Sequence, residues 1–379
     1  MRKNTNMIKV VQFIHGLNMG GAEKVVKDYA TLLNKEEFDV TVLCYEHFKD
    51  SPYESLLKEN GIRIICICDE MPLSGKCDMV SKGINKFQRY YLVKKYLKKL
   101  QPDIVHVHLQ LNDYIKYAHL NQNTKIFYTQ HFAVDRLKKN YPEQIRYLKW
   151  LQQHYDLRLI ALNEEMRKSL NNLFLTENTV VINNGIDFAK YKTDFNKQKK
   201  RQELKIPQDA FVVCHIGRFD PVKNHDFLID VFEQIKYQIP KAFLVMVGKG
   251  KTEEAVRSKL IEKGLMDATL ILNDRADVDE ILRTSDSAVF PSISEGLGIS
   301  VIEMQAAGLP CIVSEAVPME TVISNKIRFC NINDSPKTWA DMLISLTEDK
   351  ETLRYTNTDE WDIHNSIRKL EKMYEEACK

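Results

Sequence analysis

Short apolar runs that alternate with amphipathic stretches constrain the fold of this chain more than any other feature. In the first half, the runs expected to form buried strands are Ile8–Ile14, Asp39–Cys44, Arg63–Ile67, Ile104–His108, Ile126–Thr129, Leu157–Leu162 and Val180–Asn183. After the first run, apolar residues recur at helical spacing, at Ala22, Val25, Val26, Tyr29, Ala30 and Leu33. Regular alternation of strand and helix predicts an α/β fold with a parallel, doubly wound sheet.

The alternation pauses in the middle of the chain and then begins again. A turn signal at Asn183-Asn-Gly-Ile-Asp187 is followed by the polar stretch Lys192–Lys205. The later strand candidates are Phe211–Ile216, Phe243–Val247, Thr269–Leu272, Ser287–Phe290, Cys311–Ser314 and Arg328–Cys330. Since 379 residues suit two domains, we predict similar α/β domains at 1–185 and 186–360, a hinge near 184–205, and a last segment at 361–379. Ligands in such sheets bind at the carboxyl ends of the strands, so two domains facing each other would enclose one cleft.

The charge of the chain is unevenly distributed. Residues 1–185 carry 27 Lys/Arg and 20 Asp/Glu, a net of +7, and the rest carry 27 and 32, a net of −5. The stretch Ile84–Gln101 contains Lys86, Arg89, Lys94, Lys95, Lys98 and Lys99 and no acid, with aromatic and aliphatic residues between them. Such a helix can bind anionic lipid headgroups reversibly, and a solvated helix face over a packed core accounts for the same pattern. We do not expect nucleic-acid binding.

Several features favour a cytoplasmic protein, peripheral on the inner face of the cell membrane if the basic helix docks there. No run of about 18 apolar residues is present to span a bilayer, and the stretch Met7–Ile14 is too short and interrupted for a signal peptide. The eight cysteines lack C-x-x-C spacing, so we expect free core thiols and no metal site. Cys66 and Cys68 are expected on one face of a strand.

The segment from Pro291 to Glu303 has the sequence pattern of an anion-binding cradle. A strand leads into a Pro/Ser/Gly-rich loop, and the loop opens a helix whose free N–H groups and positive dipole would face a ligand. Glu295 lies in the loop and Glu303 in the helix. Carboxylates repel phosphate but accept paired hydrogen bonds from the vicinal hydroxyls of a sugar or ribose. Cradle and acids together therefore predict a nucleotide-sugar site.

A second group of residues follows the first strand of the second half. Gly217 permits a turn, and Arg218 and Lys223 emerge at the carboxyl end of the strand. Two cations there can bind a diphosphate and stabilise the charge that develops as it leaves. The next strand ends in Gly248-Lys-Gly250, which permits close approach of the backbone.

The first half contains a similar arrangement of strand, glycine loop and helix. Gly20 and Gly21 open the helix and form a second candidate cradle for an anion or sugar, although a plain tight turn fits them equally. The loop lacks the G-x-G-x-x-G pattern, which argues against a nicotinamide cofactor. His131 follows a strand, and an imidazole there could reach a ligand. His106 and His108 face the same side of a strand without an evident third metal ligand.

Together these residues resemble the family 4 retaining glycosyltransferases of GT-B fold, which have two Rossmann-like domains facing across a cleft. The resemblance runs from about residue 8 to 320 and also includes Asn184-Gly-Ile-Asp187. It implies hexosyl transfer, without metal or cofactor, from a nucleoside-diphosphate sugar, with UDP-sugars expected first, to a saccharide or lipid-linked saccharide. Residues 303–314 are most similar to bacterial enzymes of exopolysaccharide or capsule assembly.

The resemblance also implies a role for each site residue. Arg218 and Lys223 would hold the donor diphosphate, and Glu303 would bind the ribose. The donor sugar would contact Glu295 and the backbone of Gly296, Leu297 and Gly298, with Gly217 and Gly248 also in the donor site. His131 would lie beside the reacting carbon, so His131, Arg218, Lys223 and Glu295 are the expected catalytic residues. Gly20 and Gly21 would approach the donor phosphate or the acceptor, which the first domain binds, and the last helix would pack back on that domain.

Two departures from the family pattern bear on these expectations. The helix has Glu303-Met-Gln where many relatives have Glu-Ala-Met or Glu-Ala-Gln, a change we attribute to packing. Asn273-Asp-Arg275 replaces a glycine-containing loop, which leaves recognition of the base open. The alternatives are a sugar-nucleotide epimerase of GT-B-like fold and a catalytically silent partner subunit, and the occupied polar positions favour the transferase.

Overall fold

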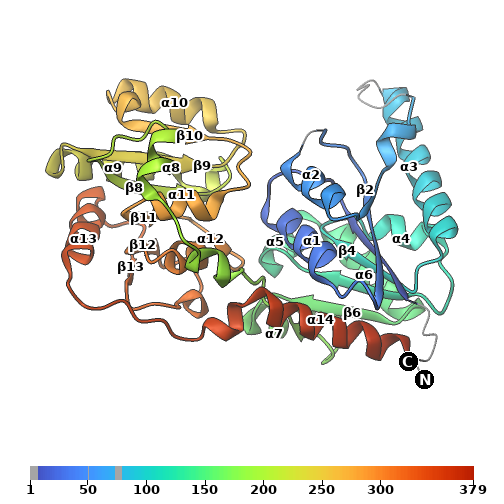
Figure 1. Ribbon diagram of the computed structural model, residues 1–379. Helices are drawn as coiled ribbons and strands as arrows, with labels where there is room; N and C mark the ends of the chain where they lie inside the picture. The colour runs from blue at the N-terminus through green and yellow to red at the C-terminus, as the bar shows by residue number, and fades with distance from the viewer. Residues whose placement is uncertain (1–6, 50, 73–78) are drawn as a thin grey trace. The chain divides into compact units, whose positions relative to one another are not determined.

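The computed structural model describes residues 7–49, 51–72 and 79–379, and the chain divides into two compact units (Figure 1). Unit 1 comprises Met1–Asn184 and Ile363–Lys379, and unit 2 comprises Gly185–Asp362. The chain therefore passes between the units twice. Each unit contains one sheet with helices around it.

The sheet of unit 1 has seven strands in the order β3-β2-β1-β4-β5-β6-β7, and every pairing is parallel. This order, in which the first strand lies inside the sheet, is that of doubly wound folds. The strands are β1 Ile8–Ile14, β2 Phe38–Cys44, β3 Arg63–Cys66, β4 Ile104–His108, β5 Lys125–Thr129, β6 Leu157–Ala161 and β7 Val180–Val181. All seven expected strands are confirmed, with the last one shorter than predicted.

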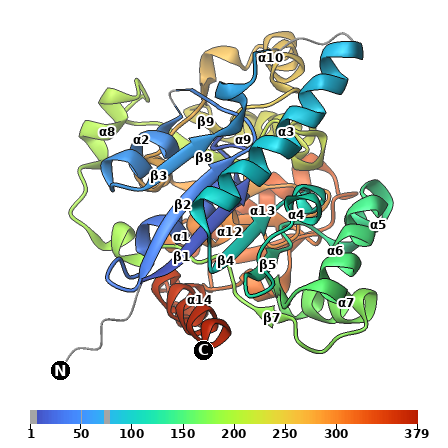
Figure 2. The ribbon, with the colours of Figure 1, turned by 90° about the vertical axis from the view of Figure 1, so that its right-hand side faces the viewer.

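The helices of unit 1 connect these strands. They are α1 Gly21–Leu32, α2 Pro52–Glu59, α3 Met79–Leu100, α4 Asn112–Ala118, α5 Val134–Asn140, α6 Pro142–His154 and α7 Glu164–Phe174, with a 3-10 turn, η1, at Ile67–Glu70. The predicted apolar stripe of α1 is buried from Val25 to Leu33. Figures 1 and 2 show α3 as a long helix that runs beside α4.

The last helix, α14 Ile363–Cys378, is part of the core of unit 1. Its Ile367, Leu370 and Tyr374 are buried in the same cluster as Tyr29 of α1 and Val42 of β2. Apolar positions three and four residues apart place these side chains on one face of the helix. Helix α14 thus belongs to the core of unit 1, whose other elements come from the first half of the chain.

The sheet of unit 2 repeats the topology of unit 1. Its order is β10-β9-β8-β11-β12-β13, again parallel throughout. The strands, all of them at the predicted positions, are β8 Phe211–Ile216, β9 Ala242–Val247, β10 Thr269–Leu272, β11 Ser287–Phe290, β12 Cys311–Ser314 and β13 Ile327–Cys330. One hydrophobic cluster covers each face of this sheet, which explains the nearly continuous apolar strands.

The helices of unit 2 include one that was expected to be a linker. They are α8 Lys197–Glu203, α9 His225–Gln238, α10 Glu253–Glu262, α11 Val278–Thr284, α12 Ile299–Ala306 and α13 Pro336–Glu348. The 3-10 turns are η2 Phe188–Lys192, η3 Pro221–Lys223, η4 Met266–Ala268, η5 Met319–Thr321 and η6 Thr358–Trp361. Helix α8 lies within the polar stretch 192–205, where buried Arg201 pairs with Asp286 at 2.8 Å and Lys200 with Asp277 at 2.7 Å. A hinge extending through residue 205 is therefore wrong, because ion pairs attach this stretch to unit 2.

The cysteine predictions need two corrections. Strand β3 ends at Cys66, and Cys68 lies in η1, so the two do not share one strand face. Cys44, Cys214, Cys311 and Cys330 are buried thiols as expected, whereas Cys66 and Cys68 are half-buried and Cys378 is exposed. Cys77 lies outside the described residues. No helix in the described part of the chain is long and apolar enough to cross a membrane.

Candidate functional site

In unit 2, two loops at the carboxyl ends of neighbouring strands carry the predicted cation and acid. Strand β8 leads to η3 with Lys223, and strand β11, which pairs with β8, leads to the loop with Glu295. The Lys223 Nζ lies 2.6 Å from the Glu295 Oε1, and both side chains are mostly buried. The same ammonium lies 4.6 Å from the centroid of the Phe290 ring. The structure thus brings together two residues that are 72 positions apart.

Backbone hydrogen bonds hold the same two loops together. The carbonyl oxygen of Val222 accepts from Ser292 Oγ at 3.0 Å and from the Ile293 N–H at 2.8 Å. The hydroxyl of Ser314, at the end of β12, donates to the Ser292 carbonyl at 2.5 Å. Our sequence reasoning missed these contacts, since nothing in the spacing of Val222 and Ser292 indicates that they meet. They position Lys223 and Glu295 without a ligand.

Arg218 and the glycines around it lie on the same edge of the sheet. The Arg218 side chain is exposed, and within the described residues its guanidinium has no ion-pair partner. A Cβ atom at Gly248 would lie 2.1 Å from the Gly217 carbonyl oxygen, and one at Gly217 would lie 2.8 Å from the His215 Nε2. Only glycine fits at position 248, because the ends of β8 and β9 approach so closely, whereas a side chain at position 217 would have to displace the His215 ring. The backbone is therefore closely packed at Gly217 and Gly248, next to the exposed Arg218 in the chain.

The loop after β11 ends in a left-handed residue at the start of α12. Gly298 has a φ of +79° and caps the helix, a conformation that favours glycine. Leu297 is buried, and so is Glu303 of α12. Burial raises the pKa of the Tyr191 hydroxyl in η2, and the negative charge of Glu303 raises it further. Glu303 is therefore a buried acid close to a phenol, whereas Glu295 is a loop acid held by a lysine.

The polar side chains of the loop Asn273-Asp-Arg275, whose part in base recognition was left open, contact residues of neighbouring segments. Asp274, at a φ of +52°, pairs with Lys249 at 2.8 Å. Arg275 Nε donates to Asp277 at 2.7 Å, and Asn273 Nδ2 to Glu253 at 3.0 Å. These contacts engage the polar side chains of the loop with partners outside it.

In unit 1, His131 lies at the end of a chain of buried hydrogen bonds. Its Nε2 lies 2.9 Å from His108 Nδ1, and His108 Nε2 lies 2.8 Å from Gln12 Oε1. Gln12 Nε2 in turn donates to the Tyr374 hydroxyl at 3.1 Å. The Tyr374 hydroxyl lies 2.6 Å from His106 Nδ1, and His106 Nε2 lies 2.7 Å from Thr129 Oγ1.

The partners determine which nitrogen carries each proton. Gln12 Oε1 can only accept, so His108 Nε2 donates to it and His108 Nδ1 accepts from His131 Nε2. This leaves the Nδ1 of His131 as an acceptor, and it is buried without a hydrogen-bond partner among the described residues. Burial lowers the pKa of His131 to about 3 and holds the pKa values of His106 and His108 well below their usual range. All three rings are therefore neutral.

The histidines of β4 behave as predicted in one respect. The rings of His106 and His108 stack with centroids 4.3 Å apart, so they do face the same side of the strand. A third histidine is near them, which sequence reasoning missed, but hydrogen bonds occupy both ring nitrogens of His106 and His108. The three rings are thus joined to one another and to the protein by hydrogen bonds.

The glycine loop of unit 1 differs from the cradle of unit 2. Gly20 caps α1, and a Cβ atom there would lie 2.3 Å from the Glu23 carboxylate, while one at Gly21 would meet nothing within 4 Å. Glu23 thus already lies at the positive end of the helix dipole and would repel an anion. Gly20 and Gly21 remain a prediction, and an anionic ligand there would require Glu23 to move.

Comparison with known proteins gives the class of this molecule. Two parallel Rossmann-like units define the GT-B fold, shared with HepE from Anabaena in a structure with UDP and glucose; the TM-score is 0.71 at 19% identity, over 98% of this chain and 97% of that one. The model of Glycosyltransferase Family 4 matches residues 19–190, and that of Glycosyl transferases group 1 matches residues 196–359.

Two curated relatives match over nearly the whole chain. The UDP-Gal:alpha-D-GlcNAc-diphosphoundecaprenol alpha-1,3-galactosyltransferase of Escherichia coli is 26% identical over 92% of this chain and 90% of its own length. The capsular polysaccharide biosynthesis glycosyltransferase CapH of Staphylococcus aureus is 26% identical over 97% of this chain and 99% of its own. The chain belongs to the family 4 glycosyltransferases of GT-B fold, and it is a glycosyltransferase.

Proposed function

We propose that the chain transfers a hexose from a UDP-sugar to a saccharide or lipid-linked saccharide in the assembly of a surface polysaccharide, with retention of anomeric configuration. The names of the relatives support this choice, because one uses a UDP-sugar and a diphosphoundecaprenol-linked acceptor and another acts in capsule biosynthesis. The observation that carries the proposal is the pair of connected loops in unit 2, where Lys223 meets Glu295 and an exposed Arg218 follows the end of β8.

The cations suit the departure of a nucleoside diphosphate. As the bond from the anomeric carbon to the phosphate oxygen breaks, negative charge develops on the diphosphate and positive charge on the sugar. Arg218 and Lys223 would bind the diphosphate and stabilise its charge without a metal ion. Lys223 would then be shared between a phosphate oxygen and Glu295. The acceptor oxygen bonds to the carbon on the face that the diphosphate leaves, and its proton passes to the departing phosphate.

The acids and the histidine would bind the rest of the donor. We assign the ribose hydroxyls to Glu303 and the sugar hydroxyls to Glu295, whose position the lysine and the loop hydrogen bonds maintain. His131 of unit 1 is proposed to contact the sugar being transferred through Nδ1, which can accept a hydrogen bond from a hydroxyl. At neutral pH this ring is an acceptor and not a proton donor, because burial lowers its pKa to about 3.

The test is incubation of the purified chain with a panel of nucleoside-diphosphate sugars, with nucleotide release as the readout. Transfer or slow hydrolysis that depends on Arg218 and Lys223 supports the proposal. An isomerised sugar nucleotide would identify an epimerase, and binding without turnover would identify a silent subunit. Near-normal turnover in both Arg218→Ala and Lys223→Ala would contradict the assigned site.

A surface of α3 favours reversible docking on an anionic membrane. Val80, Ile84, Phe87 and Tyr91 are 71%, 40%, 78% and 67% exposed, and their spacing of four, three and four residues places them on one helix face. Lys94, Lys98 and Lys99 are exposed further along the same helix. We call these seven residues the α3 face. Exposed apolar and basic residues on one helix are typical of peripheral membrane binding.

Two of the six basic residues on which this hypothesis was based are engaged elsewhere. Lys95 pairs with Glu70 at 2.8 Å, and the Arg89 guanidinium lies 4.3 Å from the centroid of the Tyr45 ring. The proposal therefore rests on the α3 face and not on every basic residue of the helix. An anionic inner leaflet is where a lipid-linked acceptor would be reached.

A further inference from the structure

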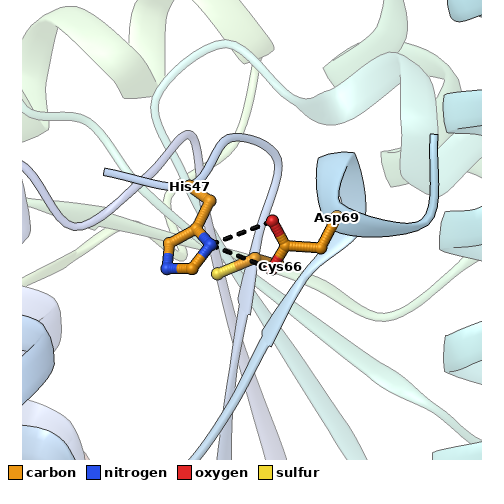
Figure 3. Close-up of side chains that lie close together, drawn as sticks. All are labelled: His47, Cys66 and Asp69. Atoms are coloured by element: carbon orange, nitrogen blue, oxygen red, sulfur yellow. Dashed lines mark hydrogen bonds and ion pairs between the residues drawn. The ribbon is translucent and has the colours of Figure 1, made fainter. Parts of the chain in front are cut away.

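A group of potential metal ligands lies in unit 1, at the carboxyl ends of the edge strand β3 and its neighbour β2, outside the residues assigned to sugar transfer. His47 follows β2, Cys66 ends β3, and Asp69 lies in η1. Figure 3 shows the three side chains pointing toward one another. One atom from each, a ring nitrogen, a sulfur and a carboxylate oxygen, lies within 4.8 Å of the others.

The distance between the imidazole and the carboxylate is close to that in a tetrahedral site, and the sulfur lies within 4.8 Å of both groups. Zinc bonds to nitrogen, oxygen and sulfur are about 2.0 to 2.3 Å long, which separates ligand atoms by about 3.3 to 3.6 Å. The His47 Nδ1 lies 2.9 Å from both Asp69 oxygens, so binding would move this pair only slightly apart. Asp69 is exposed, which leaves access for the ion and for a water molecule as fourth ligand.

The far side of the imidazole carries the partner that a metal-bound histidine usually has. The His47 Nε2 lies 3.1 Å from both oxygens of Glu54, a buried acid of α2. A carboxylate there holds the proton on Nε2, orients the ring and leaves the Nδ1 lone pair for the metal. Glu54 thus orients His47 toward Cys66 and Asp69.

Cys66 also has a neighbour that supports it as a ligand. It lies opposite Cys44 in the register of β2 and β3, and the two thiols are hydrogen-bonded. Cys44 is fully buried while Cys66 is half-buried, so Cys66 is the sulfur that an ion can reach. A metal ion would bind Cys66 as the thiolate, with release of the thiol proton to solvent.

The local charges balance when a divalent ion is present. The Cys66 thiolate, Asp69 and Glu54 carry three negative charges, and Lys58, 2.6 Å from Glu54, carries one positive charge. A divalent ion brings the sum to zero. Mixed thiolate, imidazole and carboxylate ligands favour zinc over magnesium or calcium. We infer that His47, Cys66 and Asp69 form a zinc-binding site that links the loop after β2 to the turn after β3.

The proposed role is structural, because the ion would connect two segments that otherwise meet through hydrogen bonds. The experiment titrates zinc into the metal-free, reduced full chain against a chromophoric chelator, with cobalt as a spectroscopic probe. We expect one tight site per chain, a thiolate-to-cobalt charge-transfer band and a zinc-dependent rise in Tm. Cys66→Ser and His47→Ala should abolish all three, and Glu54→Gln, which keeps the ligands, should weaken binding by about 10- to 100-fold.

Two thiol controls make the result specific. Cys378→Ser removes an exposed thiol and should change nothing, and Cys68→Ser should keep the cobalt band. Zinc binding by the native chain that is no tighter than by Cys66→Ser would overturn the inference, as would a Tm that zinc leaves unchanged. Loss of the cobalt band in Cys68→Ser with its retention in Cys66→Ser would also overturn it. His47 would then be an imidazolium between two carboxylates. Each readout is independent of sugar transfer.

Discussion

The two units of this glycosyltransferase share one strand order and build their candidate sites by opposite electrostatic means. In unit 2, an ion pair between Lys223 and Glu295 joins two loops, and an exposed Arg218 follows the end of β8. In unit 1, His131 ends a chain of buried, neutral hydrogen bonds that extends to Tyr374 of α14. The doubly wound fold thus offers the same edge for either kind of site, and the surrounding side chains decide which one forms.

Burial explains the difference between the units. A buried imidazole in a hydrogen-bonded chain remains neutral because charging it would require desolvating the ion. In unit 2, Lys223 and Glu295 instead form an ion pair between two loops. We therefore expect substitutions in unit 2 to change catalysis through charge, and substitutions at His131 to act through a single neutral hydrogen bond.

The largest expected effect is loss of a cation of unit 2. Arg218→Ala and Lys223→Ala should each lower kcat by about 10²- to 10³-fold, because each removes a donor that stabilises the leaving diphosphate. Nucleotide release under saturating donor measures this. Lys241→Ala is the matched control, because Lys241 is exposed at the amino end of β9 and pairs only with Asp209 in the described part of the chain. An equally large loss in the control would show that charge near the site is not what matters.

The next effect separates the two acids of unit 2. Glu303→Gln should weaken UDP binding by about 10- to 100-fold, since it replaces charge-assisted hydrogen bonds worth about 1.5 to 3 kcal/mol. Glu295→Gln should lower the rate and leave the affinity for free UDP nearly unchanged, because its partner is the sugar. Calorimetry with UDP compares them directly. Equal losses of affinity in the two variants would contradict the separate roles.

A smaller effect is expected at His131. His131→Ala should lower kcat by about 5- to 10-fold, the value of one neutral hydrogen bond of about 1 kcal/mol. Because the pKa of His131 is lowered to about 3, its ring stays neutral between pH 5 and 8. The ratio of native to His131→Ala activity should therefore be flat over this range. A ratio that changes near pH 6.5 would show that the ring titrates and that the neutral-chain description of unit 1 is wrong.

The lowered pKa of His131 also predicts that folding stability falls as the pH decreases. The unfolded chain binds a proton at His131 as pH falls through about 6.5, and the folded chain does so only near pH 3. Folding stability contributed by the neutral ring is thus present above pH 6.5 and is lost between pH 6.5 and 3, by up to about 1.4 kcal/mol per pH unit. Denaturant unfolding of the native chain and His131→Gln should show a shallower acid slope in the variant, and equal slopes would count against the lowered pKa.

The remaining effect concerns membrane binding by the α3 face. Liposome co-sedimentation should require anionic lipid, weaken in high salt and drop when Lys94, Lys98 and Lys99 become Glu, since each basic residue contributes about 1 kcal/mol. Phe87→Ala with Tyr91→Ala should weaken binding further. The control changes Lys192, Lys199 and Lys350 of unit 2 to Glu, with the same change in net charge. Equal loss in the control, or equal binding to neutral lipid, would remove the α3 face as the docking surface.

Sequence patterns predicted the fold in detail because its signals are local. Every expected strand of both sheets is present, and the family 4 resemblance and GT-B fold class are confirmed. The two wrong predictions also came from local sequence patterns. Cys68 was assigned to a strand because it continues an alternating pattern, yet the chain turns at Ile67. Residues 192–205 were assigned to a hinge because they are polar, yet α8 buries Arg201 against Asp286.

The residues that determine the chemistry were named from the sequence, and their partners were not. Composition and spacing alone singled out Arg218, Lys223, Glu295, Glu303 and His131, because cations, acids and an imidazole at strand ends are what a nucleotide-sugar site requires. Their roles remain predictions. Only tertiary structure decided that Glu295 pairs with Lys223, that Tyr374 joins His131 through a hydrogen-bond chain, and that His47 meets Cys66. These contacts join residues from different strands and helices, so no local pattern encodes them, whereas hydrophobic periodicity encodes each strand within a few residues.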